Sequence, residues 1–270
     1  MVGQENLKQQ ISNSINNFPR FSILTGPAGS KRTDIASYTS KALKANLIEV
    51  EGKVGDVRNV LKLAYKQTLP TLYVIVDGDN MSNGAKNALL KVTEEPPQNA
   101  YFMLILEDMG NTLPTLKSRG TEYRMDNYKP DEILEYWHSR YREFKVGEME
   151  IVSNLCTVPG DCDIIERYNI KEFNDYINSV MDNIAVVNGA NAFKISKKFK
   201  IKKDGEGYDA QLFMAGLIYN YSKRYIKELD ARNYESMKVC VKYKQDLKHK
   251  SVSKQMTLDM WILEMRGVWL

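Results

Sequence analysis

The chain has 270 residues, of which 43% are hydrophobic and 27% are charged, and its formal net charge is +4. This length allows one large domain or two to three small ones, and the composition is typical of a globular protein that buries a core. No segment approaches the roughly 18 consecutive apolar residues that a transmembrane helix needs.

Neither the first residues nor the cysteines indicate a secreted protein. The segment from Met1 to Asn6 has no basic region followed by an apolar stretch, so we do not expect a signal peptide. Cys156, Cys162 and Cys240 form no CxxC pair, which argues against a disulfide framework and a cysteine-based zinc site. A reducing compartment, and therefore a cytoplasmic location, is the expectation.

The first 125 residues alternate between helical and strand patterns. Apolar residues recur at helical spacing over 4–16, 33–45, 54–65 and 82–94, and short apolar segments predict strands over 21–25, 47–50, 72–76 and 101–106. Strongly apolar strands that alternate with helices are typical of a parallel sheet covered on both faces.

The rest of the chain shows only helical patterns. These lie at 130–144, 148–155, 161–168, 171–188, 208–229, 231–247 and 251–266. We therefore predict an α/β domain over 1–126, a small three-helix domain over 127–170 and a larger helical domain over 171–270. Basic runs at 194–203 and 242–250 could attract phosphate backbones, or could be solvated helix faces.

The segment Gly26–Thr33 occupies the place of a phosphate-binding loop, between a strand and a helix. In the GxxxxGK[ST] pattern, Gly26 and Thr33 fit. Lys31 stands at the second glycine, where a side chain restricts positive φ, and Arg32 stands at the lysine, where a guanidinium is bulkier. The loop therefore either binds nucleotide weakly or is kept only because its geometry connects the strand to the helix.

A long ordered motif carries a family resemblance. Asn87-Ala-Leu-Leu-Lys-Val-Thr-Glu-Glu-Pro-Pro97 follows an apolar run ending at Asp77 and precedes Leu113-Pro-Thr-Leu-Lys-Ser-Arg-Gly120. This order resembles the AAA+ domain of DNA sliding-clamp loaders, where the wording is NALLKxLEEPP and then LPTxxSRC. The resemblance implies an α/β AAA+ domain, namely a parallel sheet with helices on both faces, then a three-helix lid and an all-α collar that oligomerises.

The resemblance also implies that the nucleotide-handling residues are altered. Asp77 matches a Mg²⁺-binding aspartate, but Gly78 stands where the family has its water-activating glutamate. Asp79 would point to the opposite face if the strand continued. Leu106-Glu107 replace a hydroxylated pair that senses the γ-phosphate, and Asp163 matches a nucleotide-sensing arginine.

The Ser118-Arg119 pair is intact. In clamp loaders this arginine projects into the ATP site of the neighbouring subunit, so the resemblance implies that Arg119, beside Ser118, is an arginine finger acting in trans. The alternative is an arginine that pairs with a local carboxylate such as Glu122.

Together these features predict a clamp-loader subunit without ATPase activity, most similar to the bacterial delta-prime type. It lacks the family's zinc insertion between residues 41 and 54, which suggests a compact version from a phage or a divergent bacterium. The resemblance implies ATPase subunits as partners, and the sliding clamp and primed DNA indirectly. The degenerate nucleotide site would comprise Gly26, Gly29, Lys31, Arg32, Thr33 and Asp77, without a metal or cofactor, or with weakly held ATP or ADP and Mg²⁺.

Two alternatives remain open. One is an active ATP-hydrolysing motor subunit with divergent motifs, which binding of an ATP analogue would reveal. The other is a phage protein that mimics a loader subunit and binds the host complex, which co-purification with host subunits would address.

Overall fold

The structure is a computed structural model that describes residues 2–186, 194–199, 207–248 and 252–270. The chain divides into two compact units, Met1–Tyr128 and Lys129–Leu270, which we call unit 1 and unit 2. Parts of both basic runs, residues 200–203 and 249–250, lie outside the described residues. None of the described helices is long and apolar enough to cross a membrane.

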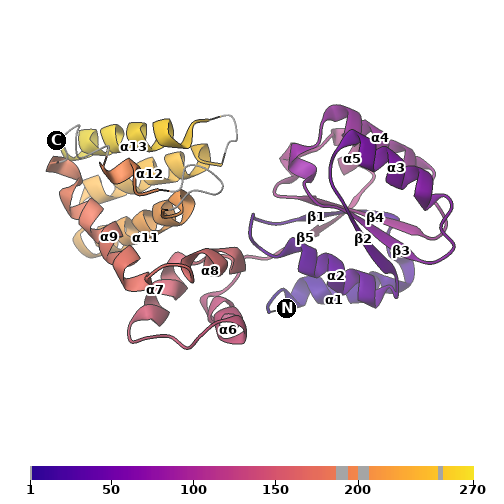
Figure 1. The fold of residues 1–270 in the computed structure, drawn as a ribbon, viewed down its shortest axis with the longest axis horizontal. Helices are drawn as coiled ribbons and strands as arrows, with labels where there is room; N and C mark the ends of the chain where they lie inside the picture. Colours follow the sequence, from indigo (N-terminus) through magenta and orange to yellow (C-terminus); the bar gives the residue numbers. More distant parts are fainter. Residues whose placement is uncertain (1, 187–193, 200–206, 249–251) are drawn as a thin grey trace. The chain divides into compact units, whose positions relative to one another are not determined.

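Unit 1 is built around a five-stranded parallel sheet in the order β2-β3-β4-β1-β5. The strands are β1 (Phe21–Thr25), β2 (Asn46–Val50), β3 (Thr71–Ile75), β4 (Ala100–Leu106) and β5 (Thr121–Arg124). The helices are α1 (Glu5–Ser14), α2 (Arg32–Ala42), α3 (Val54–Ala64), α4 (Asn83–Glu94) and α5 (Pro114–Lys117). Helices α1 and α2 cover one face of the sheet, and α3, α4 and α5 cover the other (Figure 1).

The apolar strands form the centre of this unit because both of their faces are covered. All five residues of β1 and all five of β3 are buried. Tyr73 of β3 stacks on Phe102 of β4, with ring centroids 5.2 Å apart. These contacts confirm the predicted parallel sheet with helices on both faces.

The fifth strand was not predicted from the sequence. Of the four residues of β5, only Tyr123 is buried. Its pattern therefore lacks the apolar run that marks the inner strands, and only its pairing with β1, in which Thr121 lies beside Ser22, makes it a strand.

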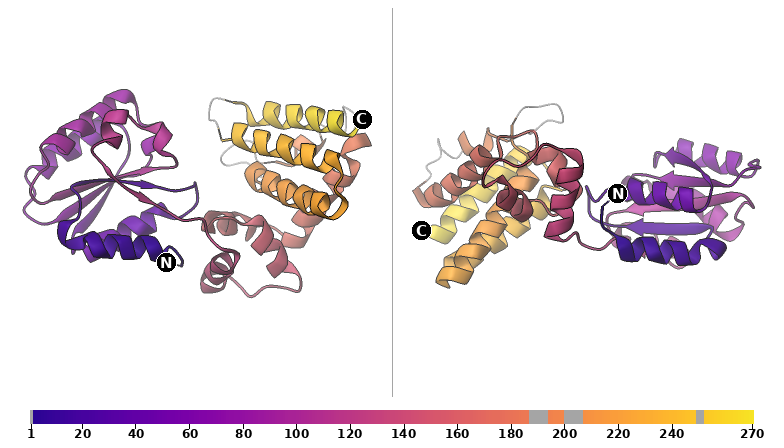
Figure 2. Two further views of the ribbon diagram at one scale, coloured as in Figure 1. Left: turned by 180° about the vertical axis from the view of Figure 1, so that it is seen from behind. Right: turned by 90° about the horizontal axis from the view of Figure 1, so that it is seen from below.

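Unit 2 is helical throughout its described part except for an isolated bridge between Phe199 and Tyr208. Its helices are α6 (Pro130–Arg140), α7 (Glu148–Leu155), α8 (Pro159–Ile165), α9 (Ile170–Asn183), α11 (Ala210–Glu228), α12 (Ala231–Asp246) and α13 (Lys254–Trp269). Helix α12 packs between α11 and α13, as the two further views also show (Figure 2).

Polar residues set the starts of the three long C-terminal helices. The side chains of Asp209, Asp230 and Ser253 accept hydrogen bonds from backbone N–H groups in the first turns of α11, α12 and α13. Such caps satisfy donors that a helix start leaves unpaired. The core that these helices enclose is rich in aromatic rings, and Phe213 meets Trp261 edge to face at 5.6 Å.

Helix α6 ends earlier than the predicted residue 144. It stops at Arg140 because Tyr141 is extended and Trp137 holds the following loop. The Trp137 ring stacks on Phe144 at 4.9 Å, and its Nε1 donates to the Arg142 carbonyl at 2.8 Å.

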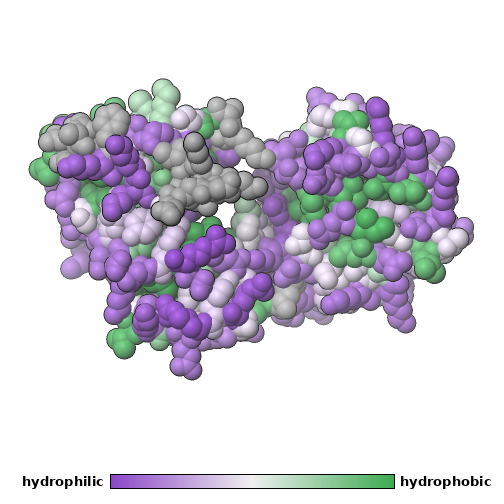
Figure 3. Space-filling view, viewed as in Figure 1, coloured by the Kyte–Doolittle hydropathy of each residue, from purple (hydrophilic) through white to green (hydrophobic). Residues whose placement is uncertain are grey.

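The division of the helical part at residue 170 stays a prediction. Helix α7 of the expected lid packs on α9 and α11 of the expected collar. Figure 3 shows hydrophobic side chains protruding on the α13 side of this unit, where Met256, Met260 and Leu263 are exposed.

Candidate functional site

The segment Gly26–Thr33 forms a tight loop between β1 and α2. The Gly26 N–H donates to the Leu106 carbonyl at 3.2 Å, and the Ser30 N–H donates to the Pro27 carbonyl at 3.2 Å. Gly29 has φ +79°, so its missing Cβ is needed there. Thr33 lies exposed in the first turn of α2.

Lys31 adopts the left-handed conformation that its side chain disfavours, with φ 60° and ψ 44°. The backbone therefore keeps the left-handed conformation that a glycine would favour, and the Lys31 side chain only makes that conformation less stable. Placing an L-residue there costs roughly 1–2 kcal/mol. Surrounding contacts therefore maintain the loop shape without the glycine.

Arg32 turns back into the loop. Its Nη1 donates to the Gly26 carbonyl at 3.1 Å and lies 4.0 Å from Oδ2 of Asp79. Its side chain is only 18% exposed, as is that of Asp79. In this position the guanidinium is engaged by groups of the same chain.

The condition on which the orientation of Asp79 was predicted is not met. Strand β3 ends at Ile75, and Gly78–Asn80 form a 3₁₀ turn, so the alternation of strand faces does not extend to residue 79. The Asp79 carboxylate instead accepts the Glu107 N–H at 2.8 and 3.0 Å and the Asn111 amide at 2.9 Å. It thereby connects the ends of β3 and β4.

Gly78 lies against β4 without room for a side chain. An ideal Cβ there would come within 2.6 Å of the Ile105 carbonyl oxygen and 2.7 Å of carbons in Leu104 and Leu106. The neighbouring Asp77 carboxylate accepts a hydrogen bond from the Asn80 amide at 2.5 Å. Local packing thus excludes a glutamate at position 78 in this arrangement.

A cavity of about 350 Å³ joins the loop to the ends of β3 and β4. Lys31 and Arg32 line it together with three carboxylates, those of Asp77, Asp79 and Glu107. Carboxylates repel phosphate groups, and Arg32 donates one N–H to the Gly26 carbonyl of the loop. Two cationic side chains therefore share this cavity with three carboxylates.

Asp163, the position that matches the nucleotide-sensing arginine, has structural partners within unit 2. The Tyr136 hydroxyl donates to its Oδ1 at 2.9 Å, and the Tyr141 hydroxyl donates to the same oxygen. Burial and the bond to this carboxylate raise the pKa of Tyr136 to about 12. Both tyrosines therefore remain protonated donors at neutral pH.

Arg119 lies at the opposite edge of the sheet from the loop. It immediately precedes Gly120 and β5, whose first residue pairs with the start of β1, whereas the loop follows the end of β1. A five-residue strand spans about 17 Å. Arg119 therefore belongs to the amino edge and the Gly26–Thr33 loop to the carboxyl edge.

The carboxylate beside Arg119 is Glu94, and not Glu122, which was the example given for the alternative of local pairing. Arg119 Nη2 lies 3.2 Å from Glu94 Oε1, and Nη1 donates to the Thr115 carbonyl at 3.1 Å. Glu122 instead accepts from the Thr25 hydroxyl at 2.9 Å. The two side chains of the Arg119–Glu94 pair are 39% and 58% exposed. Such an exposed pair is worth about 1 kcal/mol or less, so Arg119 can exchange it for another partner.

The residues beside Arg119 have mainly local roles. The Ser118 hydroxyl donates to the Thr115 carbonyl at 3.2 Å. Gly120, which replaces the family cysteine, leaves no room for a side chain. An ideal Cβ there would come within 2.8 Å of Ile23 carbons and 2.9 Å of Phe21.

An ion pair in unit 2 between the buried Glu148 and the partly exposed Arg142 was not anticipated from the sequence. Glu148 is 2% exposed and accepts two hydrogen bonds from Arg142, at 2.7 and 3.1 Å, and one from the Lys145 N–H at 2.8 Å. The Arg142 guanidinium lowers the pKa of Glu148 against the opposing effect of burial. An arginine six residues before the first glutamate of a helix is the only sequence signal for this pair, and it is a weak one.

Known proteins resemble this chain in sequence and in fold. The family model described as "DNA polymerase III, delta subunit" matches residues 53–129. DNA polymerase III subunit gamma of Buchnera aphidicola subsp. Schizaphis graminum is 21% identical, and the match covers 76% of this chain and 68% of that protein. Subunit tau of Bacillus subtilis is 25% identical over 44% of this chain, which spans only 27% of that protein's length.

Solved structures support the same fold class. A DNA polymerase III gamma subunit-related protein from Thermotoga maritima matches 98% of this chain and 100% of its own, with a TM-score of 0.54 and 16% identity. The RuvB Holliday junction branch migration motor of the same organism covers 82% of this chain and 78% of its own, with a TM-score of 0.52 and 19% identity. The α/β AAA+ fold with a helical C-terminal part is thereby confirmed. By its motifs, its fold and these relatives, the chain is similar to the clamp-loader AAA+ proteins of the DNA polymerase III gamma, tau and delta-prime type.

Proposed function

We propose that this chain is a delta-prime-like clamp-loader subunit that does not hydrolyse ATP itself and supplies Arg119 to a neighbouring subunit's ATP site. The observation that carries the proposal is the state of its own loop. Arg32 is bonded to the Gly26 carbonyl, and Gly78 has no space for a water-activating glutamate. Partners in this role are ATPase subunits of the loader, with the sliding clamp and primed DNA engaged through the assembly.

The position of Arg119 supports action in trans. The arginine lies at the edge of the sheet opposite to its own loop, so its own nucleotide site is out of reach. Its exposed pair with Glu94 can be exchanged at little cost. An arginine that enters a neighbour's ATP site would stabilise negative charge on the transferring phosphoryl group.

The test is ATP turnover by the complex reconstituted with its ATPase subunits. We expect Arg119→Ala to slow hydrolysis at the adjacent site by a factor on the order of 10³, and Arg119→Lys to restore little because the forked guanidinium is lost. Arg58→Ala is the matched control, because Arg58 is an exposed arginine of the same unit on α3. Wild-type turnover in a fully assembled Arg119→Ala complex would overturn the finger assignment.

The absence of intrinsic turnover has a separate test. The isolated chain should release no phosphate from ATP with Mg²⁺ and primed DNA. Turnover near 1 s⁻¹ that disappears in Asp77→Ala would establish an active motor subunit instead.

Assembly is assigned to the helical part from about residue 171, through the exposed apolar residues of α13. Met260 is 48% and Leu263 is 55% exposed. Replacing both with glutamate should leave the helical content unchanged and prevent binding of the ATPase subunits. Undiminished complex formation by this double variant in size-exclusion chromatography would remove α13 from the interface.

A further inference from the structure

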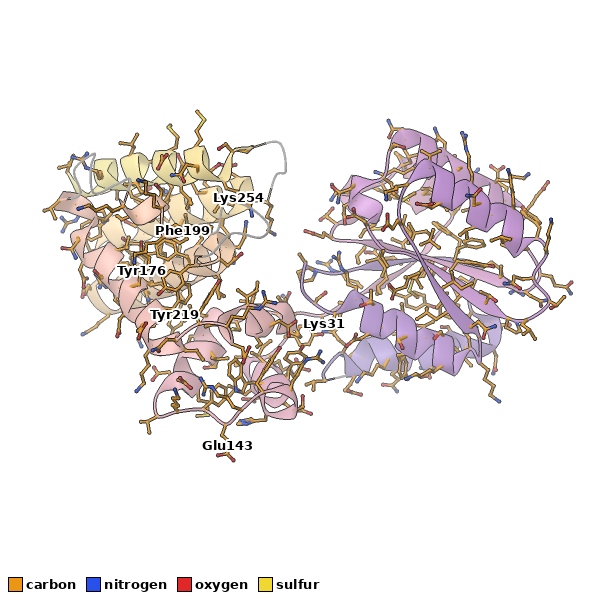
Figure 4. All side chains as sticks on the ribbon, in the orientation of Figure 1. Lys31, Glu143, Tyr176, Phe199, Tyr219 and Lys254 are labelled. Carbon is orange, nitrogen blue, oxygen red and sulfur yellow. The ribbon has the colours of Figure 1, made fainter. Side chains whose placement is uncertain are left out.

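Unit 2 contains a cavity of about 440 Å³ between α7, α9 and α11. The three helices approach closely because Gly216 of α11 has no side chain. An ideal Cβ there would come within 2.6 Å of Ile177 on α9 and 3.0 Å of Leu155 on α7. Tyr219, labelled in Figure 4, is one turn further along α11 and lines the cavity.

Four asparagine side chains dominate the polar lining, one from α7, two from α9 and one from α11. They are Asn154, Asn174, Asn178 and Asn220, and all four are partly buried. The side-chain Nδ2 of Asn220 donates to the side-chain Oδ1 of Asn178 at 3.3 Å. Within the described parts of the chain, the carboxamides of Asn154 and Asn174 have no hydrogen-bond partner. Several donors and acceptors are therefore available to a ligand.

The charges of the cavity are nearly balanced. Lys223 Nζ lies 3.8 Å from Glu150 Oε1, and Arg224 Nη2 lies 2.6 Å from Asp182 Oδ1. A site for a nucleic-acid backbone carries uncompensated cations, which release counterions from phosphates. The recognition chemistry of this cavity therefore comes mainly from its carboxamides.

Carboxamides match the main chain of a peptide. Each asparagine offers an N–H donor and a carbonyl acceptor, the same pair of groups that a peptide unit presents. An extended segment exposes these groups because it has no internal hydrogen bonds. We propose that this cavity binds an extended segment of a partner protein through the main-chain amides of that segment. This site is independent of the proposed role of Arg119.

The proposal can be tested with a library of random dodecapeptides displayed on phage and selected against the full-length chain. Enriched peptides would be synthesised with a fluorescein label and titrated by fluorescence polarisation. We expect Asn154→Ala with Asn174→Ala to weaken binding at least tenfold, because each lost hydrogen bond contributes about 1 kcal/mol. These two side chains have no partners within the described chain, so the unfolding midpoint should not change.

The matched control is Asn183→Ala. Asn183 is also an asparagine of α9, but it is exposed, donates to the Ser179 carbonyl at 2.8 Å and does not line the cavity. The Asn183→Ala variant should bind the selected peptides with the affinity of the wild type. The proposal is overturned if no peptide is enriched, or if the double variant binds the selected peptides normally. It is also overturned if a fluorescein-labelled oligothymidine binds with the same asparagine dependence and competes with the peptides.

Discussion

Adding a single methyl group at Gly78 should destabilise unit 1. In Gly78→Ala, the new Cβ would lie 2.6 Å from the Ile105 carbonyl oxygen, where ordinary contacts are about 3.5 Å. That oxygen belongs to β4, which is paired on one side with β1 and on the other with β3, so the backbone cannot easily move. Inserting a methyl group into a packed core costs about 1–3 kcal/mol. With a backbone atom and two leucine side chains in the way, we expect about 3 kcal/mol, or a Tm lower by about 10 °C.

The assay must follow unit 1 separately from unit 2. All three tryptophans, Trp137, Trp261 and Trp269, lie in unit 2, so their fluorescence reports on that unit. Hydrogen exchange measured by mass spectrometry on peptides from β3 and β4 reports on unit 1. The variant should speed exchange in these peptides and leave the tryptophan transition unchanged.

Gly55→Ala is the control for this measurement. An ideal Cβ at Gly55 meets no atom within 4 Å, and the residue lies in the first turn of α3. Its replacement should be neutral or stabilise by up to about 1 kcal/mol. If Gly78→Ala proves as stable as Gly55→Ala, the close approach is wrong, and a glutamate at position 78 could be accommodated. On our reasoning, Gly78→Glu destabilises unit 1 and confers no ATPase activity.

Three further results are expected from variants of the full chain. Gly120→Cys, which introduces the family residue, should destabilise unit 1 by about 1–3 kcal/mol in the same exchange assay, because its Cβ would meet Ile23; unchanged exchange would contradict this. Lys31→Gly should relieve the left-handed strain and stabilise unit 1 by up to about 1 kcal/mol, after the greater entropy of the unfolded glycine is subtracted, and a Tm below that of the wild type would contradict it. Because Arg142 lowers the folded pKa of Glu148, the pair's contribution to stability is present above the unfolded pKa of about 4.3 and is lost as the pH falls through the folded pKa. Glu148→Gln should therefore lower stability at pH 7 and weaken its dependence on pH below about 5, as measured by tryptophan fluorescence in urea; an unaltered pH profile would show that Glu148 does not titrate with folding.

The resemblance to clamp loaders and the arrangement of elements along the chain follow from local patterns. The apolar strands of unit 1 and the amphipathic helices of both units were predicted because burial imposes a periodicity on neighbouring residues. The motif from Asn87 to Pro97 indicated a resemblance to clamp loaders because its residues are contiguous in the sequence. Strand β5 was not predicted because this short edge strand buries only one side chain and therefore has no apolar run.

The contacts that determine the chemistry of the site depend on tertiary structure. Asp79 turns toward Glu107 because β3 ends early and β4 lies beside it, although 28 residues separate the two in sequence. Arg119 pairs with Glu94, and not with Glu122, which is nearer in sequence, because α4 and α5 pack together on one face of the sheet. Sequence alone showed that a carboxylate is missing at Gly78, whereas only the packing of β4 showed that none would fit there. The physical reason is that helices and strands arise from interactions between close neighbours, whereas a site joins residues that the order of strands in the sheet brings together.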